Sequence, residues 1–313
     1  MMTGQGDEAI AVATMRAGAQ DYCSKNGFTP DVLDRAVRMA MQKHARKRKR
    51  DAARVRIQTA FRKEKSKRRE LEASLRAAHD IQQKLIPARA PAFAGFDIAG
   101  AYLPAQATSG DFFDYLPIIR DELGIVVGDV SGHGLGAALL AAEIRAYTRA
   151  LWSLHPDLGD LAKIVNGLLC EDMMEGEFAT LMFGKFHRDE RSLTYLSAGH
   201  PALLVRADGT DVSLETQSIP LGMMDEIQGL ASVTVPLDPG DIVLLLTDGL
   251  TETTAANGEW LFGNTNCFET IRAHRTESAG KIVERLLLAA RAFAQGEPQH
   301  DDITVVVVKI ADG

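Results

Sequence analysis

Several aspartates stand where strongly apolar segments begin or end, or directly after a glycine. In chain order they are Asp111 after Thr108-Ser109-Gly110, Asp129 after the apolar run 124–128, Asp248 after the run 242–247, and the pair Asp301-Asp302 before the run 303–308. A carboxylate at the edge of a buried segment carries a desolvation penalty of roughly several kcal/mol unless another group meets its charge. The sequence places no matched basic residue beside these positions. The missing partner is therefore expected to be a cation.

Short carboxylates around hard cations are the ligand chemistry of Mg²⁺ and Mn²⁺. Several carboxylates together can hold two ions ~3.5–4 Å apart, and such a pair activates water for attack on phosphorus. The flanking glycines let the backbone approach closely, so that a carbonyl oxygen can also bind a metal. In the alternative interpretation each aspartate caps a turn or a helix. Four separate sites in one domain favour the metal interpretation, although Asp114 and Asp302 also suit turn or supporting positions.

Three histidines lie close to these motifs. None is needed as the general base of a catalytic serine or cysteine, because attack by activated water requires no covalent intermediate. His133 has the side chain of a proton donor to a leaving serine, but its place in the corner Ser131-Gly132-His133-Gly134 favours a role in building the turn. His200 is interpreted as a turn histidine that supports the site. His300 is a candidate to orient the neighbouring carboxylate of Asp301.

The composition is that of a globular protein. Of 313 residues, 46% are hydrophobic and 25% are charged, which excludes a wholly disordered chain and a collagen-like repeat. No run approaches about 18 consecutive apolar residues, so no membrane span is expected. The N-terminus lacks a basic-then-apolar signal pattern, which predicts a cytoplasmic location. The three cysteines form no CxxC pair, which argues against a disulfide scaffold or a thiolate zinc site.

Charge divides the chain into a basic segment and an acidic remainder. Residues 41–70 hold 14 Lys+Arg and 3 Asp+Glu, a local charge of +11, so the net charge of −7 leaves −18 for the remainder. Residues 41–86 lack Gly and Pro, and Leu71, Leu75 and Ala78 have the spacing of a weak coiled coil. We therefore predict a linker helix over residues 41–86 that pairs with its copy in a homodimer. A nucleic-acid-binding arm is the disfavoured alternative, because the basic block lacks a base-reading Asn.

The first 40 residues show the element order helix, strand, helix. The segment 7–17 is expected to be a helix, 21–25 a short strand, and a second helix begins at Pro30. The string "MRAGAQDY" and Lys25 resemble the last third of a response-regulator receiver domain, in which a lysine contacts the phosphate. The strands that would carry the phosphoacceptor aspartate are lacking. Residues 1–40 are therefore predicted to be a partial α/β receiver fragment that does not accept phosphate by itself, or else a plain helical extension.

From residue 96 onward, short β-rich runs are interrupted by a few helices. The expected strands are 96–102, 123–129, 180–187, 192–197, 202–206, 233–236, 242–246 and 303–310. The expected helices are 135–154, 158–173 and 279–294, with Glu143 and Arg145 facing outward. Many strands without strict alternation indicate an α+β fold rather than a doubly wound parallel sheet.

Six strings in this region form an ordered set of motifs. They are "PAQATSGDFFD", "GIVVGDVSGHGLGAALL", "YLSAGHPALL", "IPLGM", "PGDIVLLLTDGLTE" and "HDDITVVVVK". In order, they resemble the motifs of the metal-dependent PPM serine/threonine phosphatases, and most closely the bacterial subgroup of sporulation stage II protein E and the stress-response sigma-factor regulators. The resemblance implies a PPM-type phosphatase domain over residues 87–313, folded as two stacked antiparallel β-sheets flanked by helices.

The resemblance also implies a role for each aspartate. Asp129 would bridge two divalent ions, either Mn²⁺ or Mg²⁺, and the carbonyl of Val130 would bind one of them. Asp248 and Asp301 would complete one metal site, while Asp111 would hold the second ion directly or through water. Asp302, next to Asp301, is an alternative ligand. Asp129 and Asp248 are the residues predicted to be catalytic.

The activity implied is hydrolysis of phosphoserine or phosphothreonine on a regulatory protein, by in-line attack of activated water. In this subgroup the typical substrate is a phosphorylated anti-sigma-factor antagonist, which is therefore the expected partner. A second hypothesis is a catalytically silent, phosphatase-like adaptor that binds a signalling partner. The complete set of aspartates disfavours the adaptor, because a non-catalytic protein gains nothing from a cluster that is costly to bury.

Overall fold

The computed structural model describes residues 2–3, 8–19, 23–24, 29–255, 258 and 260–311. The chain divides into two units, residues 1–73 and residues 74–313. None of the helices in the described ranges combines the length and the apolar character that crossing a bilayer requires.

The first unit holds two short strands and two helices. Strand β1 (Met2–Thr3) pairs in parallel with β2 (Cys23–Ser24), and helix α1 (Glu8–Arg16) lies between them in the chain. Helix α2 (Pro30–Leu85) begins in this unit. The helix near residues 7–17 and the helix starting at Pro30 are confirmed, and β2 falls within the predicted strand. Lys25 lies outside the described residues, so the receiver-like fragment stays a prediction.

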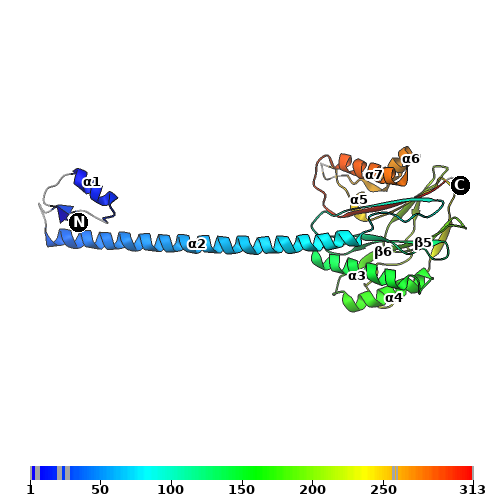
Figure 1. The fold of residues 1–313 in the computed structure, drawn as a ribbon, viewed down its shortest axis with the longest axis horizontal. Helices are drawn as coiled ribbons and strands as arrows, with labels where there is room; N and C mark the ends of the chain where they lie inside the picture. The colour runs from blue at the N-terminus through cyan, green and yellow to red at the C-terminus, as the bar shows by residue number, and fades with distance from the viewer. Residues whose placement is uncertain are drawn as a thin grey trace. The chain divides into compact units, whose positions relative to one another are not determined.

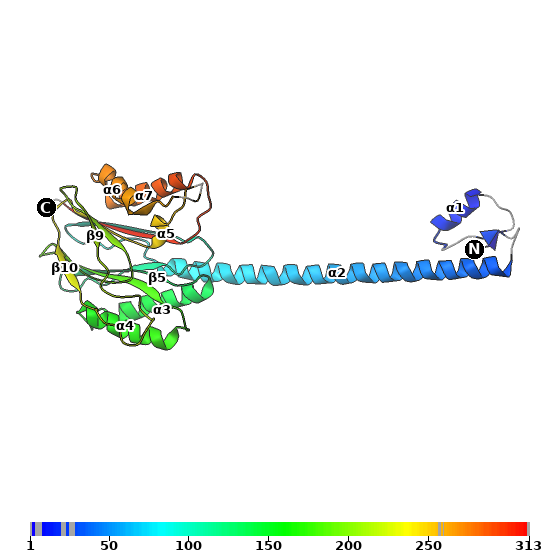
Figure 2. The same ribbon diagram turned by 180° about the vertical axis from the view of Figure 1, so that it is seen from behind.

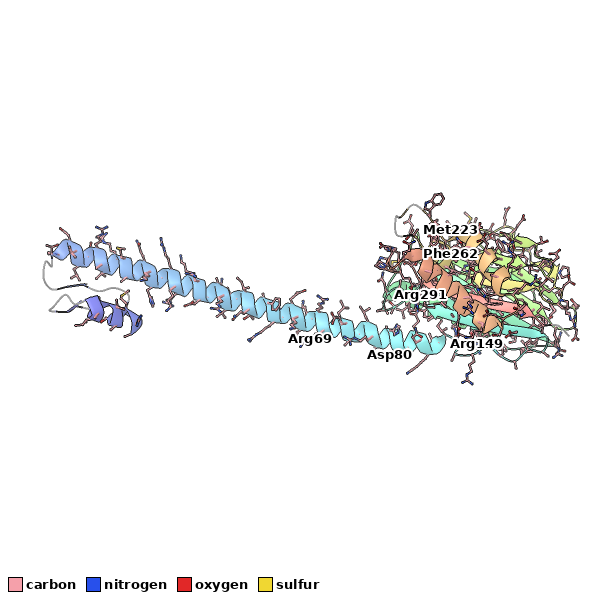
Figure 3. The ribbon with its side chains drawn as sticks, turned by 90° about the horizontal axis from the view of Figure 1, so that it is seen from above. Arg69, Asp80, Arg149, Met223, Phe262 and Arg291 are labelled. Atoms are coloured by element: carbon pink, nitrogen blue, oxygen red, sulfur yellow. The ribbon has the colours of Figure 1, made fainter. Side chains whose placement is uncertain are left out.

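Helix α2 is one continuous helix of 56 residues. The helix predicted at Pro30 and the linker helix predicted over residues 41–86 are parts of this one helix, because neither Gly nor Pro interrupts the chain from residue 31 to Leu85. Many of its side chains are exposed, and Arg69 is one of them (Figure 3). Several are large and apolar, with 61–70% of each exposed: Val55, Ile57, Phe61 and Leu71.

The second unit is built on two five-stranded antiparallel sheets (Figure 1). The first sheet has the order β10-β7-β6-β5-β4, and the second has the order β3-β12-β11-β8-β9. The strands are β3 (Phe96–Leu103), β4 (Phe112–Tyr115), β5 (Glu122–Val130), β6 (Ala179–His187), β7 (Ser192–Ala198), β8 (Ala202–Val205), β9 (Asp211–Leu214), β10 (Val233–Pro236), β11 (Ile242–Leu246) and β12 (Ile303–Ile310).

Helices cover the outer face of each sheet, so this unit has four layers (Figures 1 and 2). Helices α3 (Leu135–Leu151) and α4 (Leu158–Asp172) lie on the first sheet, and α6 (Gly263–His274) and α7 (Ala279–Ala294) lie on the second. The one-turn helix α5 (Asp248–Thr251) follows β11.

Alternation along the strands builds a separate core on each face of each sheet. In β5, Ile125 and Val127 point into the core between the sheets, while Val126 and Val130 point into the core under α3 and α4. Both faces are buried, which is why these strands are apolar throughout. The predicted α+β fold of two stacked antiparallel sheets is confirmed. Strands β4 and β9 and helices α5 and α6 were not predicted, because they are short or polar segments.

Candidate metal centre

In the first sheet, β4 and β5 bring two aspartates together. The antiparallel register of these strands sets Asp111, just before β4, level with Asp129 near the end of β5. Gly110 permits this approach, because a Cβ at that position would lie 2.5 Å from the carbonyl oxygen of Val130. The Val130 N–H donates to the Gly110 carbonyl at 3.3 Å, which fixes the two segments side by side.

In the second sheet, β11 and β12 bring the other aspartates together. Asp248 is the first residue of α5, directly after β11, and Asp301 and Asp302 directly precede β12. Since β11 and β12 are antiparallel neighbours, the end of one lies beside the start of the other. Gly249 allows a close approach here too, because a Cβ would overlap the carbonyl oxygen of Asp302.

A hydroxyl joins the two sheets beneath these aspartates. Thr247 Oγ1 donates a hydrogen bond to Asp111 Oδ2 at 2.6 Å, and the Thr304 N–H donates to the same hydroxyl at 2.9 Å. Thr247 and Thr304 belong to the second sheet, whereas Asp111 precedes a strand of the first. The aspartates contributed by both sheets therefore lie at one edge of the sandwich.

Mutual repulsion and burial raise the pKa values of this cluster. Burial first, and then the negative charges of Asp248 and Asp301, raise the pKa of Asp129 to about 6. Burial and the charge of Asp129 raise the pKa of Asp111 well above its usual range. Burial and the charge of Asp301 also raise the pKa of Asp248. These interactions show that the four carboxylates are close enough to repel one another.

The chemistry of this donor set fits a divalent cation. Asp111 is only 2% exposed, and none of the ion pairs among the described residues involves any member of the cluster. Within those ranges, no three His, Cys, Asp or Glu side chains lie close enough together to hold a metal ion as they stand. Mg²⁺ keeps several waters and takes only one or two carboxylates, so an open arrangement of carboxylates suits it.

Asp301 and Asp302 point to different environments although they are adjacent. Asp302 Oδ1 accepts a hydrogen bond from the Ala105 N–H at 2.7 Å, and burial raises its pKa. It thereby holds the loop that precedes β4. Asp301 is exposed, and its Oδ1 accepts from the Asp302 N–H at 2.8 Å. Of the two, Asp301 is the carboxylate open to an ion from solution.

Asp114 is not part of the cluster. Its buried carboxylate accepts from Arg149 at 2.7 Å and pairs with Arg145 at 3.1 Å, both on α3 (Figure 3 labels Arg149). The expectation that Arg145 faces outward is wrong, because its side chain is 18% exposed and turned to Asp114. The expectation that the aspartates lack basic partners is also wrong for Asp114. Residues 35 positions apart in the chain meet here, which no local pattern predicts.

Gln82, near the end of α2, contacts the loop that carries Asp111. Its amide Nε2 donates to the Ser109 carbonyl at 2.6 Å, and its Oε1 accepts from the Ser109 N–H at 3.1 Å. The Ser109 hydroxyl in turn accepts from the Asp111 N–H at 3.0 Å. Gln82 is 6% exposed. Gln82 was not among the predicted site residues, and its one signal in the sequence is that it shares a helix face with Ala78 and Leu85.

Replacement of Gln82 by Ala is expected to weaken Mn²⁺ binding about 10- to 100-fold, the usual effect of removing a group that orients a ligand. The change leaves the N–H and carbonyl of Ser109 without partners in a buried place. Titration calorimetry with Mn²⁺ measures the effect. Gln83 is the matched control, since it is the exposed neighbour on the same helix. If Gln82→Ala and Gln83→Ala bound Mn²⁺ with the same affinity, Gln82 would have no role in positioning the metal ligands.

His200 is a buried, neutral histidine rather than a group facing the edge. Its Nδ1 lies 2.9 Å from Thr180 Oγ1, and its carbonyl accepts from Ser197 Oγ at 2.6 Å. Burial lowers its pKa to about 4. His133, in contrast, lies exposed at the corner between β5 and α3.

The low pKa of His200 predicts a loss of stability in acid. In the unfolded chain this residue becomes protonated as the pH falls below its ordinary pKa of 6.5. In the folded chain it becomes protonated only near pH 4. The titration of His200 therefore lowers the free energy of unfolding by up to about 3 kcal/mol as the pH falls through this window. Urea unfolding between pH 7 and pH 4.5 should show a weaker pH dependence for His200→Gln than for the unchanged protein. His44→Gln, at an exposed position on α2, should keep the full dependence.

Solved structures with this fold are PP2C-type phosphatase domains. The SiaA-PP2C domain of Pseudomonas aeruginosa superposes with a TM-score of 0.69 at 21% identity, covering 77% of this chain and 98% of that chain. The catalytic domain of the serine/threonine protein phosphatase PstP, in complex with two manganese ions, has a TM-score of 0.50 at 18% identity, covering 69% and 99%. The fold is therefore that of a PP2C-type domain.

The chain belongs to the Stage II sporulation protein E (SpoIIE) family, whose model matches residues 120–311. Phosphoserine phosphatase RsbU of Bacillus subtilis (strain 168) is 27% identical over 247 residues, covering 77% of this chain and 71% of RsbU. Phosphoserine phosphatase RsbP of the same organism is 24% identical over 215 residues, covering 67% of this chain and 51% of RsbP. The chain thus spans about half the length of RsbP. The resemblance of the six motifs to this subgroup is confirmed.

Proposed function

We propose that the chain is a metal-dependent protein phosphatase that hydrolyses phosphoserine or phosphothreonine on a regulatory protein. The observation that carries the proposal is the set of carboxylates, drawn from both sheets, that repel one another at one edge without a cationic partner among the described residues. Membership of the SpoIIE family and the names of RsbU and RsbP as phosphoserine phosphatases support it.

Two divalent ions, Mn²⁺ or Mg²⁺, fit this edge, as the two manganese ions in PstP support for the fold. Asp129 would contribute to both metal sites, and the carbonyl of Val130 would contribute to one of them. Asp248 and Asp301 would complete one site, while Asp111 would hold the other ion directly or through water. Asp302 is the alternative ligand beside Asp301, although its hydrogen bond to Ala105 favours a supporting role.

The ions, when bound, activate a water and neutralise charge on the phosphoryl oxygens. The side chains around the cluster hold the carboxylates in position. Thr247 fixes the orientation of the Asp111 carboxylate through its hydrogen bond. Gln82 and Ser109 set the loop on which Asp111 lies. None of the described ion pairs brings a guanidinium or an ammonium group to the cluster, so the proposed phosphate binding would rely mainly on the metal ions.

The test is hydrolysis of a phosphoserine peptide by the purified protein with Mn²⁺, and again with a chelator. Release of inorganic phosphate should require the metal and return when Mn²⁺ is added back. The adaptor hypothesis predicts the opposite result, which is tight binding of a phosphopeptide without turnover. The phosphatase assignment would be wrong if folded protein released no phosphate from any of several phosphoserine and phosphothreonine peptides.

The proposed substrate is a phosphorylated anti-sigma-factor antagonist, as the resemblance to the sigma-factor regulators implies. A pull-down of candidate regulatory proteins in their phosphorylated and unphosphorylated forms tests this partner. Preferential dephosphorylation of such an antagonist over an unrelated phosphoprotein is the supporting result.

The proposed homodimer rests on the exposed apolar side chains of α2, notably Phe61 and Leu71. Exposed apolar surface of this kind on a basic, otherwise polar helix suits pairing with a second copy. Sedimentation velocity should show a dimer that dissociates when both residues become Gln, whereas Lys65→Gln on the same helix leaves it intact. A monomer for the unchanged protein at high concentration would contradict the proposal. Salt-dependent binding to DNA would instead support the nucleic-acid alternative.

A further inference from the structure

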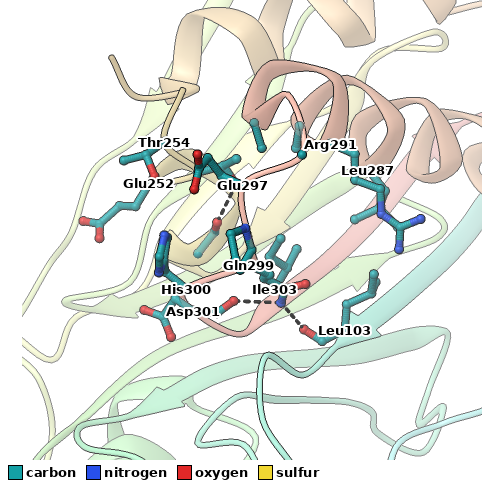
Figure 4. A pocket seen from close by; sticks show the side chains of 16 residues that line it. Leu103, Glu252, Thr254, Leu287, Arg291, Glu297, Gln299, His300, Asp301 and Ile303 are labelled. Carbon is teal, nitrogen blue, oxygen red and sulfur yellow. Dashed lines mark hydrogen bonds between the residues drawn. The ribbon is translucent and has the colours of Figure 1, made fainter. Parts of the chain in front are cut away.

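A pocket of about 490 Å³ opens beside the carboxylate cluster (Figure 4). It is lined by Asp301 of that cluster and by Gly249, which follows Asp248 in the chain. Its apolar lining comes from the end of β3, from α7 and from the start of β12: Leu103, Leu287, Ala290, Ala294 and Ile303. Among the described residues, its polar rim carries three carboxylates and one guanidinium: Glu252, Glu297, Asp301 and Arg291.

One side chain ties the wall of this pocket to the metal edge. Gln299 Nε2 donates to the Leu103 carbonyl at 2.8 Å and to the Asp301 carbonyl at 2.7 Å, as Figure 4 shows. Among the other lining residues, Thr253 Oγ1 donates to the Gly249 carbonyl at 3.0 Å. The pocket is therefore formed in advance, at a fixed place relative to Asp301.

We infer that this pocket binds an aliphatic side chain of the phosphoprotein substrate, within three residues of the phosphoserine. The inference rests on the proposed function, because the phosphoserine must lie at the carboxylate cluster. An extended chain advances ~3.3–3.6 Å per residue, so only the nearest neighbours of the phosphoserine can enter a pocket that borders Asp301.

The lining decides which side chain enters. Apolar walls with a few polar groups at the mouth are the usual form of a pocket that binds an apolar group and fixes its orientation. An acidic side chain is disfavoured, because Glu252 and Glu297, the two described rim carboxylates that are not assigned to metal, outnumber the guanidinium of Arg291. A leucine-sized side chain would move out of water and pack against Leu287 and Ile303. The apolar surface buried in this way would favour leucine over alanine.

The experiment uses the full chain with Mn²⁺ and a set of phosphoserine peptides on an alanine background. Leucine is placed in turn at each of the three positions on either side of the phosphoserine, and p-nitrophenyl phosphate serves as the substrate without flanking residues. At one position, leucine should raise kcat/KM about tenfold or more over alanine. Leu287→Gln, which places an amide in the pocket, should reduce this leucine-to-alanine ratio to about one.

Leu288 gives the matched control, because it is the next residue of α7, is 56% exposed and lies outside the pocket. Leu288→Gln should keep the full leucine preference. Two results would overturn the inference: no preference for leucine at any position, or a preference that survives Leu287→Gln. A sedimentation change in Leu287→Gln with no change in peptide preference would assign the pocket to contact with a second copy instead. Absence of metal-dependent turnover of p-nitrophenyl phosphate by the unchanged protein would contradict the phosphatase assignment itself.

Discussion

Replacement of Asp129 by Asn is expected to lower kcat/KM on the order of 10³-fold or more and, at the same time, to stabilise the metal-free protein. The loss of activity follows because Asp129 is the carboxylate that interacts with Asp111 on one side and with Asp248 and Asp301 on the other. In the proposed arrangement it is the carboxylate that would contribute to both metal sites. Phosphate release from a phosphoserine peptide at saturating Mn²⁺ measures the first effect.

The gain in stability has a definite sign and pH window. The folded pKa of Asp129 is about 6, above its ordinary value of 3.8. A raised carboxyl pKa means that the metal-free fold loses stability as the pH rises through this window, and that the loss is complete at pH 7. Removing the charge should return about 1–3 kcal/mol to the free energy of unfolding at pH 7.

Asp189→Asn is the control for both effects. Asp189 is exposed in the turn that follows β6, and β6 pairs with β5 so that this turn lies at the end of the sheet away from Asp129. Neither activity nor metal-free stability should change there by more than a few-fold or about 0.5 kcal/mol. Full activity in Asp129→Asn would remove this residue from the ligand set, and lower stability without metal would show that its charge is already compensated.

Removal of divalent ions should lower the thermal stability of the unchanged protein. An ion present at 100 times its dissociation constant adds about 2.7 kcal/mol to the free energy of unfolding. For a domain of this size that is a shift of Tm of about 5–10 °C. Differential scanning calorimetry with Mn²⁺ and with a chelator measures it.

The same scan on Asp248→Asn separates the cluster from binding elsewhere. This variant lacks one carboxylate of the second sheet, so Mn²⁺ should raise its Tm much less than it raises that of the unchanged protein. An equal rise in both proteins would place the ion outside the cluster.

Much of the fold was predictable because both faces of its central strands are buried. β11 and β12 have the predicted bounds, since apolar runs such as 242–246 end sharply at polar residues. The edge strand β10 also has the predicted bounds, although it is largely exposed. The segments that were missed lack such runs. β4 is a strand of four residues between two loops, and α5 is a single turn that begins at Asp248.

The candidate site divides in the same way. The aspartates could be named because each stands at a strand end or beside glycine, where sequence alone marks an unusual place for a charge. The residues that hold these aspartates in place could not be named from the sequence. Thr247 reaches Asp111 across 136 positions of the chain, and Gln82 reaches Ser109 across 27. Such contacts depend on how the sheets stack and where a helix ends, which periodicity does not encode.

The carboxylate cluster is divided between the sheets, with Asp111 and Asp129 from one and Asp248 and Asp301 from the other. An ion held by both pairs is a tether across the sandwich, and coordination tolerates only about 0.2 Å of error in each bond. We therefore expect a small displacement between the layers to weaken metal binding before the protein unfolds. Phe186, wholly buried in the core between the sheets, is one of the side chains that set their spacing.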